Sequence, residues 1–136
     1  MSISLEMAEK MADAAKSKAL SLGCAVSVAI VDNGGFVLTV SRMDGALALS
    51  ADASINMAYT AAMFGKDGVK IIPFVSRPWF QSMVISTSGK IVAAEGEMPI
   101  MIGDTVVGGI GAAGASSDQD VACCLAAIKA FNDEAD

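Results

Sequence analysis

Histidine is absent from the 136 residues of this protein, and the absence bears first on chemistry. Imidazole is the side chain that most often binds haem iron and most often serves as a general base near neutral pH. A histidine-based metal site is therefore excluded, and we expect no resident metal ion. Haem iron would have to be bound by methionine, cysteine, threonine or Tyr59, which are less common ligands.

Cysteine is scarce as well, with three residues in the chain, of which Cys123 and Cys124 are adjacent. An odd number of thiols without C-x-x-C spacing fits reduced cysteines better than a disulfide framework. The helical period of the last segment puts Cys124 and Leu125 on the buried face. We therefore interpret both adjacent cysteines as structural.

Positive charge is sparse and scattered. Nine Lys and Arg residues stand against fifteen Asp and Glu, and no basic cluster occurs that would bind nucleic acid or an anionic membrane. No stretch of about 18 apolar residues lacks a charge, glycine or proline, which argues against a membrane-spanning helix. The first residues do not have the charged-then-apolar order of a signal peptide, so we expect a cytoplasmic protein.

Small and soft apolar side chains are what the sequence has in excess. Hydrophobic residues make up 54% of the chain, and much of this share is alanine and methionine, which suit close helix contacts and faces between subunits. The length is typical of one domain. We therefore expect a single domain over residues 1–136 that assembles into a homo-oligomer.

Two helices are predicted in the first half of the chain. The first is capped by Ser4 and continues to Gly23, because its apolar residues recur in steps of three and four. The second lies within residues 47–64, with Ser50 as one candidate cap and Gly65 just beyond its end.

A β-hairpin is predicted between these helices. The β-branched run Cys24–Asp32 and the run Phe36–Arg42 flank the sequence Asn-Gly-Gly, and Asn-Gly between such runs is the strongest short-range hairpin signal.

The second half is predicted to contain further strands and a closing helix. Residues 66–90 carry two prolines and no clean hydrophobic period, and a short helix after Ser76 is the one element they indicate. A strand is predicted to begin at Ile91, and a second strand-like run ends at Ile102. After a turn at Gly103 and Asp104, a last strand is predicted over residues 105–112. Because strands come in hairpins, the expected fold is α+β, with a central antiparallel sheet of about five strands and helices packed on it.

The glycines Gly109, Gly111 and Gly114 spell G-x-G-x-x-G, the pattern of a dinucleotide-binding turn. That turn functions where a second parallel strand follows its helix and where an acidic residue meets the ribose. After Gly114 the chain has room for its closing helix alone. We therefore predict that these glycines serve packing and that the protein does not bind NAD.

The closing helix begins with a capping box, formed either by Ser116 with Gln119 or by Ser117 with Asp120. Free N–H groups at such a helix start are suited to a small anion.

Four ordered stretches give the chain a resemblance to the GlcG / HbpS / PduO C-terminal family, known as the haem-degrading or haem-binding domain family. They are VAIVDNGGFVL, SRMDGALALS, ASINMAYTAAMFG and MPIMIGDTVVGGIGAAGASSDQDVACCLAA. Each motif alone is unspecific, but together they cover nearly all of the chain except its middle segment.

The resemblance implies a profilin-like α+β domain that forms homo-oligomers. Members of this family are haem or corrinoid accessories, or are encoded beside enzymes of glycolate, propanediol or glycerol utilisation. Two positions depart from the family pattern: Met57 stands where many members have lysine, and Glu97 follows Gly96 where many have a second glycine. The first removes a cation and the second adds a carboxylate, so the pocket chemistry is expected to differ.

Charged side chains in apolar surroundings are the remaining candidates for function. An ion pair between Arg42 and Asp44, or between Arg42 and a glutamate, would join a loop to the sheet or one subunit to another. Alternatively, Arg42 or Arg77 binds a small carboxylate or a haem propionate, because guanidinium matches carboxylate in a bidentate manner. Trp79 and Phe80 would then form a wall of the ligand pocket.

Three functions remain open on these residues. The first is a ligand-binding accessory protein for haem, another tetrapyrrole, or a small hydroxy acid or diol. The second is a cofactor-independent isomerase or lyase that uses Arg42 or Arg77 for substrate charge and Glu95 or Glu97 for proton transfer. The third is a structural or assembly role in a metabolic operon.

Overall fold

Four antiparallel strands form one sheet in the order β2-β1-β4-β3, in a computed structural model that describes residues 2–135. The strands are β1 (Ser27–Asp32), β2 (Val37–Arg42), β3 (Glu97–Ile102) and β4 (Thr105–Ala113). The helices are α1 (Leu5–Ser21), α2 (Ser50–Phe64), α3 (Gly68–Ile71), the 3₁₀-helix η1 (Ile72–Phe74), α4 (Pro78–Ser86) and α5 (Ser117–Ala135). This arrangement confirms the predicted α+β class.

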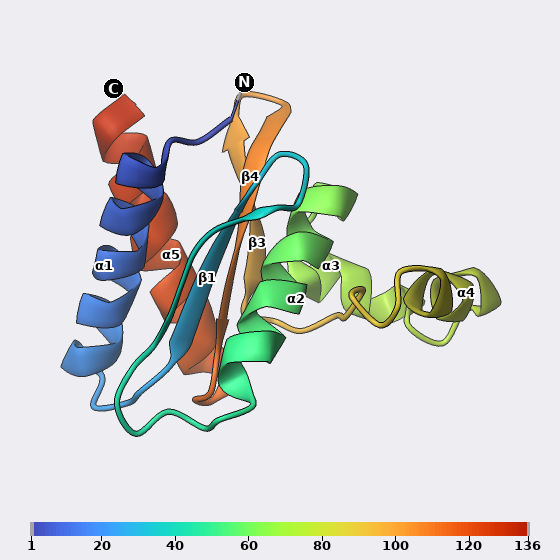
Figure 1. The fold of residues 1–136 in the computed structure, drawn as a ribbon, viewed down its shortest axis with the longest axis horizontal. Coiled ribbons are helices and arrows are strands. Elements are labelled where there is room, and N and C mark those ends of the chain that lie inside the picture. Colours follow the sequence, from blue (N-terminus) through green and yellow to red (C-terminus); the bar gives the residue numbers. More distant parts are fainter. Residues whose placement is uncertain (1, 136) are drawn as a thin grey trace.

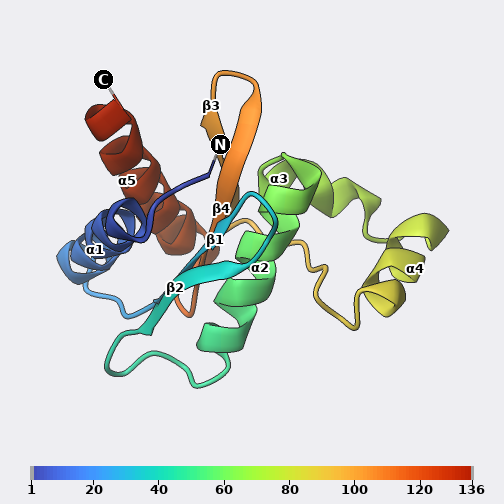
Figure 2. The ribbon, with the colours of Figure 1, turned by 45° about the horizontal axis from the view of Figure 1, so that its top comes forward.

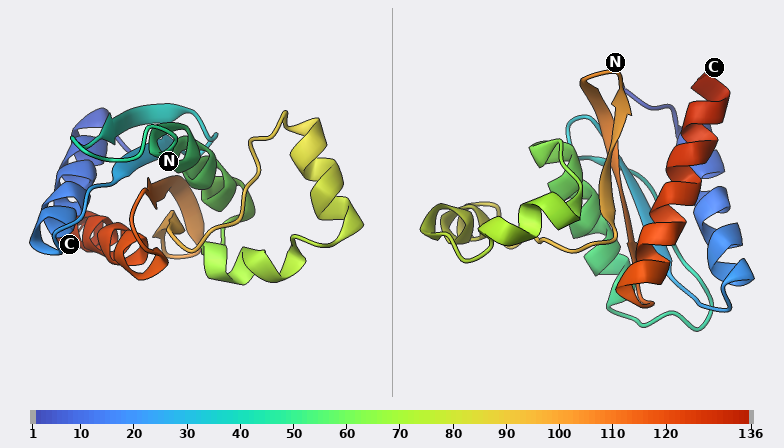
Figure 3. Two further views of the ribbon diagram at one scale, coloured as in Figure 1. Left: turned by 90° about the horizontal axis from the view of Figure 1, so that it is seen from below. Right: turned by 180° about the vertical axis from the view of Figure 1, so that it is seen from behind.

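The helices lie in two layers around the sheet. Helices α1 and α5 cover one face and α2 covers the other, while α4 projects away from the sheet beyond α2 (Figures 1 and 3). The main hydrophobic core lies under α1 and α5, where Ala8, Ala12, Ala15 and Ala19 are all buried. Alanines at these helical steps let α1 approach its neighbours closely.

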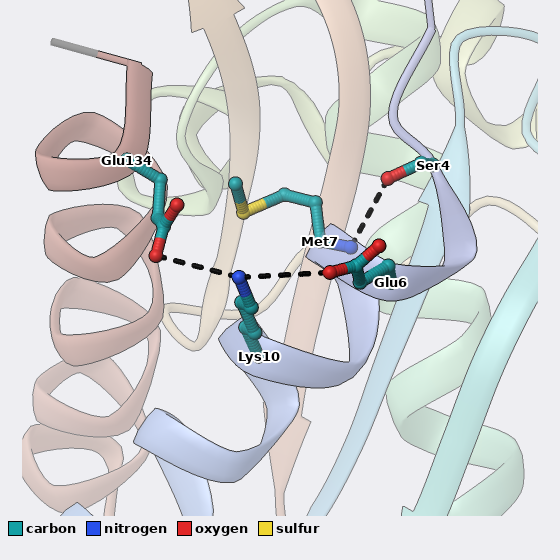
Figure 4. Close-up of polar contacts among 5 residues, drawn as sticks. All are labelled: Ser4, Glu6, Met7, Lys10 and Glu134. Carbon is teal, nitrogen blue, oxygen red and sulfur yellow. Dashed lines mark hydrogen bonds and ion pairs between the residues drawn. The ribbon is translucent and has the colours of Figure 1, made fainter.

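Helix α1 begins as the sequence predicts. The Ser4 hydroxyl accepts a hydrogen bond from the Met7 N–H at 3.1 Å, which caps the helix (Figure 4). Further along the same helix, Lys10 forms ion pairs with Glu6 at 3.8 Å and with Glu134 of α5 at 3.4 Å. The second pair joins the two helices that share this face of the sheet.

The glycines of β4 bring the sheet into backbone contact with α2. A β-carbon on Gly109 would collide with the carbonyl oxygen of Ala58, and one on Gly111 with that of Ser54. Gly114 has a φ of +117°, which lets the chain leave the strand. The packing interpretation of the G-x-G-x-x-G motif is thereby confirmed, because these residues fit a strand under a helix.

The expectation of five strands is wrong by one, since the segment from Ile91 is not a strand. Its backbone donors bond to side chains instead of to a neighbouring strand. The Val92 N–H donates to the Thr60 hydroxyl at 2.9 Å, and the Ala94 N–H donates to Glu97 Oε1 at 2.5 Å. The segment therefore follows α2 and joins the sheet at Glu97.

The first residues of two helices also differ from the prediction. Ser50 does not cap α2; it is the first helical residue, and its hydroxyl donates back to the Leu47 carbonyl at 2.6 Å. Arg77 rather than Ser76 precedes α4, which begins at Pro78. Proline fits that position because its φ suits a helix and its missing N–H is not needed there.

The closing helix uses the first of its two candidate capping boxes. The Gln119 N–H donates to the Ser116 hydroxyl at 3.2 Å, and the Ser116 N–H donates to Gln119 Oε1 at 3.1 Å. The Ala115 N–H donates to Asp120 Oδ1 at 3.1 Å. These contacts engage donors that a bound anion would need, so the structure gives the anion prediction no support.

Cys124 is buried in the main core, as predicted, and so is Cys123, but the prediction for Leu125 is wrong, because Leu125 is 54% exposed on the outer side of α5. Burial raises the pKa of Cys123 to about 11 and that of Cys124 further still. The Cys124 thiol donates to the Gly96 carbonyl at 3.2 Å. Both thiols are thus protonated core residues.

Candidate functional site between α2 and α4

An apolar cleft of about 390 Å³ lies between α2 and the projecting α4. We call it the aromatic cleft. Its lining comprises Tyr59, Met63, Phe64, Trp79, Met83, Thr87 and Ile91. Figure 2 shows α4 standing apart from α2, with the connecting segments on either side.

Helical spacing builds both walls of this cleft. Tyr59 and Met63 are four residues apart on α2, and Trp79 and Met83 are four residues apart on α4, so each pair lies on one side of its helix. Thr87 continues the α4 series just past the helix end, where its hydroxyl donates to the Met83 carbonyl at 2.7 Å.

Aromatic contacts hold the α4 wall against the rest of the protein. The Trp79 ring centroid lies 6.3 Å from that of Phe64, 5.8 Å from that of Phe74 and 5.8 Å from that of Phe80. Phe80 is buried behind this layer and stacks on Phe64 at 6.1 Å. Trp79 remains 47% exposed, so its ring is fixed by neighbours yet open to a ligand.

Of the sequence-predicted site residues, Tyr59 and Trp79 come together in this cleft. Phe80, expected to line it beside Trp79, instead supports Trp79 from the core. The lining residues Phe64, Met83, Thr87 and Ile91 were not predicted as site residues. The i, i+4 spacing of Trp79 and Met83 is a signal for Met83 alone, because Phe64, Thr87 and Ile91 lie outside α4.

Arg42 and Asp44 lie elsewhere and do not pair. Both are exposed, and Arg42 Nη1 donates to the Ala46 carbonyl at 3.2 Å. Among residues 2–135 the ion pairs within 4.0 Å all involve lysines. The predicted ion pair of Arg42 with Asp44 or a glutamate is therefore wrong within one chain. The guanidinium group binds the Ala46 carbonyl instead, and this contact joins the loop to the end of β2.

Arg77 and Glu95 are also exposed and separate from Arg42. Arg77 precedes α4 and Arg42 ends β2, and these two elements lie on opposite sides of α2 (Figure 2). Among residues 2–135, neither Arg42 nor Arg77 forms an ion pair with Glu95 or Glu97 within 4.0 Å.

Glu97 is fully buried, with none of its side chain exposed. It faces the α2 side of the sheet, where Gly68 of α3 leaves room for its side chain. Burial raises the pKa of Glu97 to about 9, and the hydrogen bond from Ala94 opposes this only in part. Glu97 is thus a desolvated glutamate, but a substrate has no access to its carboxyl group.

Comparison with known proteins places this geometry in a family. The family model described as "Haem degrading protein HbpS-like" matches residues 3–129. The chain belongs to this HbpS-like family of α+β sheet proteins, as its sequence resemblance indicated.

Individual relatives extend the comparison. An uncharacterised 15.0 kDa protein of Citrobacter freundii, from the dhaT-dhaS intergenic region, is 32% identical and the alignment covers 96% of this chain and 93% of that protein. The crystal structure of the Klebsiella pneumoniae protein ORFY matches with a TM-score of 0.89 at 29% identity, covering 96% of this chain and 90% of that one. The crystal structure of a PduOC–haem complex matches with a TM-score of 0.87 at 27% identity, covering 97% and 96%.

Within residues 2–135, no helix combines the length and apolar character required to cross a membrane.

Proposed function

We propose that this protein is a ligand-binding accessory protein whose aromatic cleft takes up a haem-type tetrapyrrole. The observation that carries the proposal is the cleft itself, an apolar slot with Tyr59 on one wall and Trp79 on the other. Flat apolar ligands are bound by concave, aromatic-lined sites of this kind. The haem complex of a relative with the same fold supports this choice of ligand.

The residues of the cleft are compatible with haem as a bound ligand. Thioether sulfur binds haem iron in other proteins, and Met63 and Met83 bring two such sulfurs to the lining. Trp79 and Phe64 offer aromatic surface for the porphyrin ring. The cleft thus supplies an iron ligand and ring contacts without histidine.

Titration with haemin tests this proposal. We expect a saturable shift of the Soret band at micromolar haemin and a loss of affinity of about tenfold or more in Trp79→Ala, because a large aromatic contact is removed. The matched control is Ile85→Ala on the same helix, since Ile85 is 79% exposed and does not line the cleft. No saturable shift, or equal affinity in the two variants, contradicts the proposal.

We also propose that copies of the chain associate with one another. Large apolar side chains in several parts of the chain are more than a third exposed, namely Leu20, Leu22, Leu47, Leu49 and Leu125. Such exposure is typical of surfaces that are covered in an assembly. Light scattering is expected to give a mass of several chains, and a single-chain mass at all concentrations would contradict self-association. A place in glycolate, propanediol or glycerol utilisation stays a prediction.

A further inference from the structure

A second cleft lies on the other side of Tyr59. We call it the hairpin cleft; its volume is about 220 Å³, and it is lined by Gly35, Phe36, Val37, Ile55, Asn56, Tyr59 and Lys90. The first three residues belong to the tip of the β1–β2 hairpin and the next three to α2. Tyr59 lines both this cleft and the aromatic cleft.

Three polar side chains, those of Lys90, Asn56 and Tyr59, line the hairpin cleft without a hydrogen-bond or ion-pair partner for their polar groups among the described residues. Lys90 Nζ lies 5.6 Å from the centroid of the Tyr59 ring. Among residues 2–135, Lys90 forms no ion pair, and neither the Asn56 amide nor the Tyr59 hydroxyl forms a hydrogen bond with another residue. Asn56 and Tyr59 are half-buried, and their polar groups remain accessible to a ligand with matching acceptors.

The backbone holds Lys90 in place beside Tyr59. The Thr60 hydroxyl contacts the Lys90 carbonyl at 3.3 Å and accepts the Val92 N–H at 2.9 Å, so the segment after α4 is fixed along α2. The carboxylate of Asp32, which ends β1, is engaged within the hairpin, where Oδ1 accepts the N–H groups of Gly34 at 2.9 Å and Phe36 at 3.0 Å. The ammonium group is therefore left for a ligand.

We propose that the hairpin cleft binds the carboxylate group of a small organic acid, with Lys90 supplying the charge and Asn56 and Tyr59 the neutral donors. A carboxylate has two oxygens and accepts several hydrogen bonds, which matches one ammonium, one amide and one phenol. Ile55, Val37 and Phe36 then cover a short carbon skeleton. On a chain of net charge −6, the selection of an anion requires a local arrangement of this kind.

Two kinds of ligand carry a carboxylate group that would fit this cleft. One is a free small acid. The other would be a propionate of a tetrapyrrole bound in the aromatic cleft, since Tyr59 lines both clefts. The first source is independent of the proposed haem function, whereas the second rests on it.

Lactate and its neutral amide, lactamide, are the probes for a free acid. We expect lactate to shift the backbone amide resonances of residues 35–37 saturably, and lactamide to bind about tenfold more weakly or worse, because the charged contact is missing. Lys90→Met retains the aliphatic stem and is expected to weaken lactate binding by about tenfold or more. Lys70→Met, on exposed Lys70 of α3, is the matched control and is expected to bind as the unmodified chain does.

Haemin and haemin dimethyl ester are the probes for a propionate. If the propionate is the ligand, Lys90→Met weakens haemin binding by about tenfold but leaves the affinity for the ester unchanged. Lactate binding that depends on Lys90, without any haemin binding, would support the hairpin cleft and overturn the haem proposal alone. Equal binding of lactate and lactamide overturns the free-acid source. The carboxylate proposal as a whole is overturned if Lys90→Met changes neither lactate nor haemin affinity.

Discussion

Glu97 and Ala94 are joined by a hydrogen bond from the Ala94 N–H to Glu97 Oε1 at 2.5 Å, while Glu97 Oε2 is buried and has no partner among residues 2–135. Oε1 thus binds the backbone of the segment that leads into β3. The other oxygen keeps the carboxyl group protonated, since burial raises its pKa from 4.5 to about 9.

This arrangement predicts that the protein loses stability as the pH rises from 5 to 8. Between pH 4.5 and about 9 the folded chain retains the Glu97 proton, whereas the unfolded chain releases it. Asp120 acts in the same direction, because burial raises its pKa from 3.8 to about 6. The Glu97 contribution to the slope is roughly 1.4 kcal/mol per pH unit.

Glu97→Gln is therefore expected to flatten the pH dependence and to raise the free energy of unfolding at pH 7.5 by roughly 2–4 kcal/mol. Urea denaturation at several pH values measures both effects. Glu95→Gln is the control, since Glu95 is an exposed neighbour whose substitution leaves the slope unchanged. A slope in Glu97→Gln equal to that of the unmodified chain would show that Glu97 is ionised in the folded state.

Gly111→Ala is expected to lower the free energy of unfolding by about 1–3 kcal/mol, because its β-carbon collides with the Ser54 carbonyl in a fully packed layer. Gly34→Ala is the control: the neighbouring Phe36 ring is 73% exposed and has room to move. Thermal and urea unfolding of the two variants measure the difference. Equal stability would mean that α2 is not held against β4 by backbone contact.

Ser116→Ala is expected to cost about 1 kcal/mol of stability, because the Gln119 N–H loses its acceptor at the start of α5. Ser117→Ala removes the hydroxyl of the alternative box and is expected to have little effect. A larger cost for Ser117→Ala in urea denaturation would place the cap one residue later.

The single tryptophan is a built-in probe of where haem binds. Trp79 lines the aromatic cleft, so its fluorescence is expected to fall with the same haemin midpoint as the Soret shift. In Ile85→Ala the same quenching should occur, since that residue lies outside the cleft. A Soret shift that saturates while the fluorescence persists would locate haem at a different surface.

Local signals were sufficient for much of the fold. Ser4, the Asn-Gly-Gly turn and the Ser116–Gln119 box act within a few residues, and each appears where the sequence predicts it. The segment from Ile91 misled the prediction because its apolar run resembles a strand. One of its hydrogen-bond partners, Thr60, comes from a distant part of the chain, and the other, Glu97, is a side chain and not a neighbouring strand.

The site was less accessible to sequence reasoning for the same reason. The sequence indicates Tyr59 as a possible haem ligand and Trp79 as a pocket wall, but the cleft depends on how residues 66–90 fold back toward α2. The full burial of Glu97 likewise depends on Gly68, which is distant in the sequence. Such long-range contacts leave no periodic signal in the chain.

The two walls of the aromatic cleft are fixed by different means. Helix α2 rests on the bare backbone of β4, so Tyr59 and Met63 take their positions from the sheet. Helix α4 is secured through the rings of Phe64, Phe74 and Phe80 around Trp79. Substitutions in those rings can therefore alter the width of the opening, and with it the ligands admitted, while the sheet stays unchanged. Ligand choice and fold stability are consequently encoded in separate parts of the sequence, which leaves the first free to diverge among proteins that share the second.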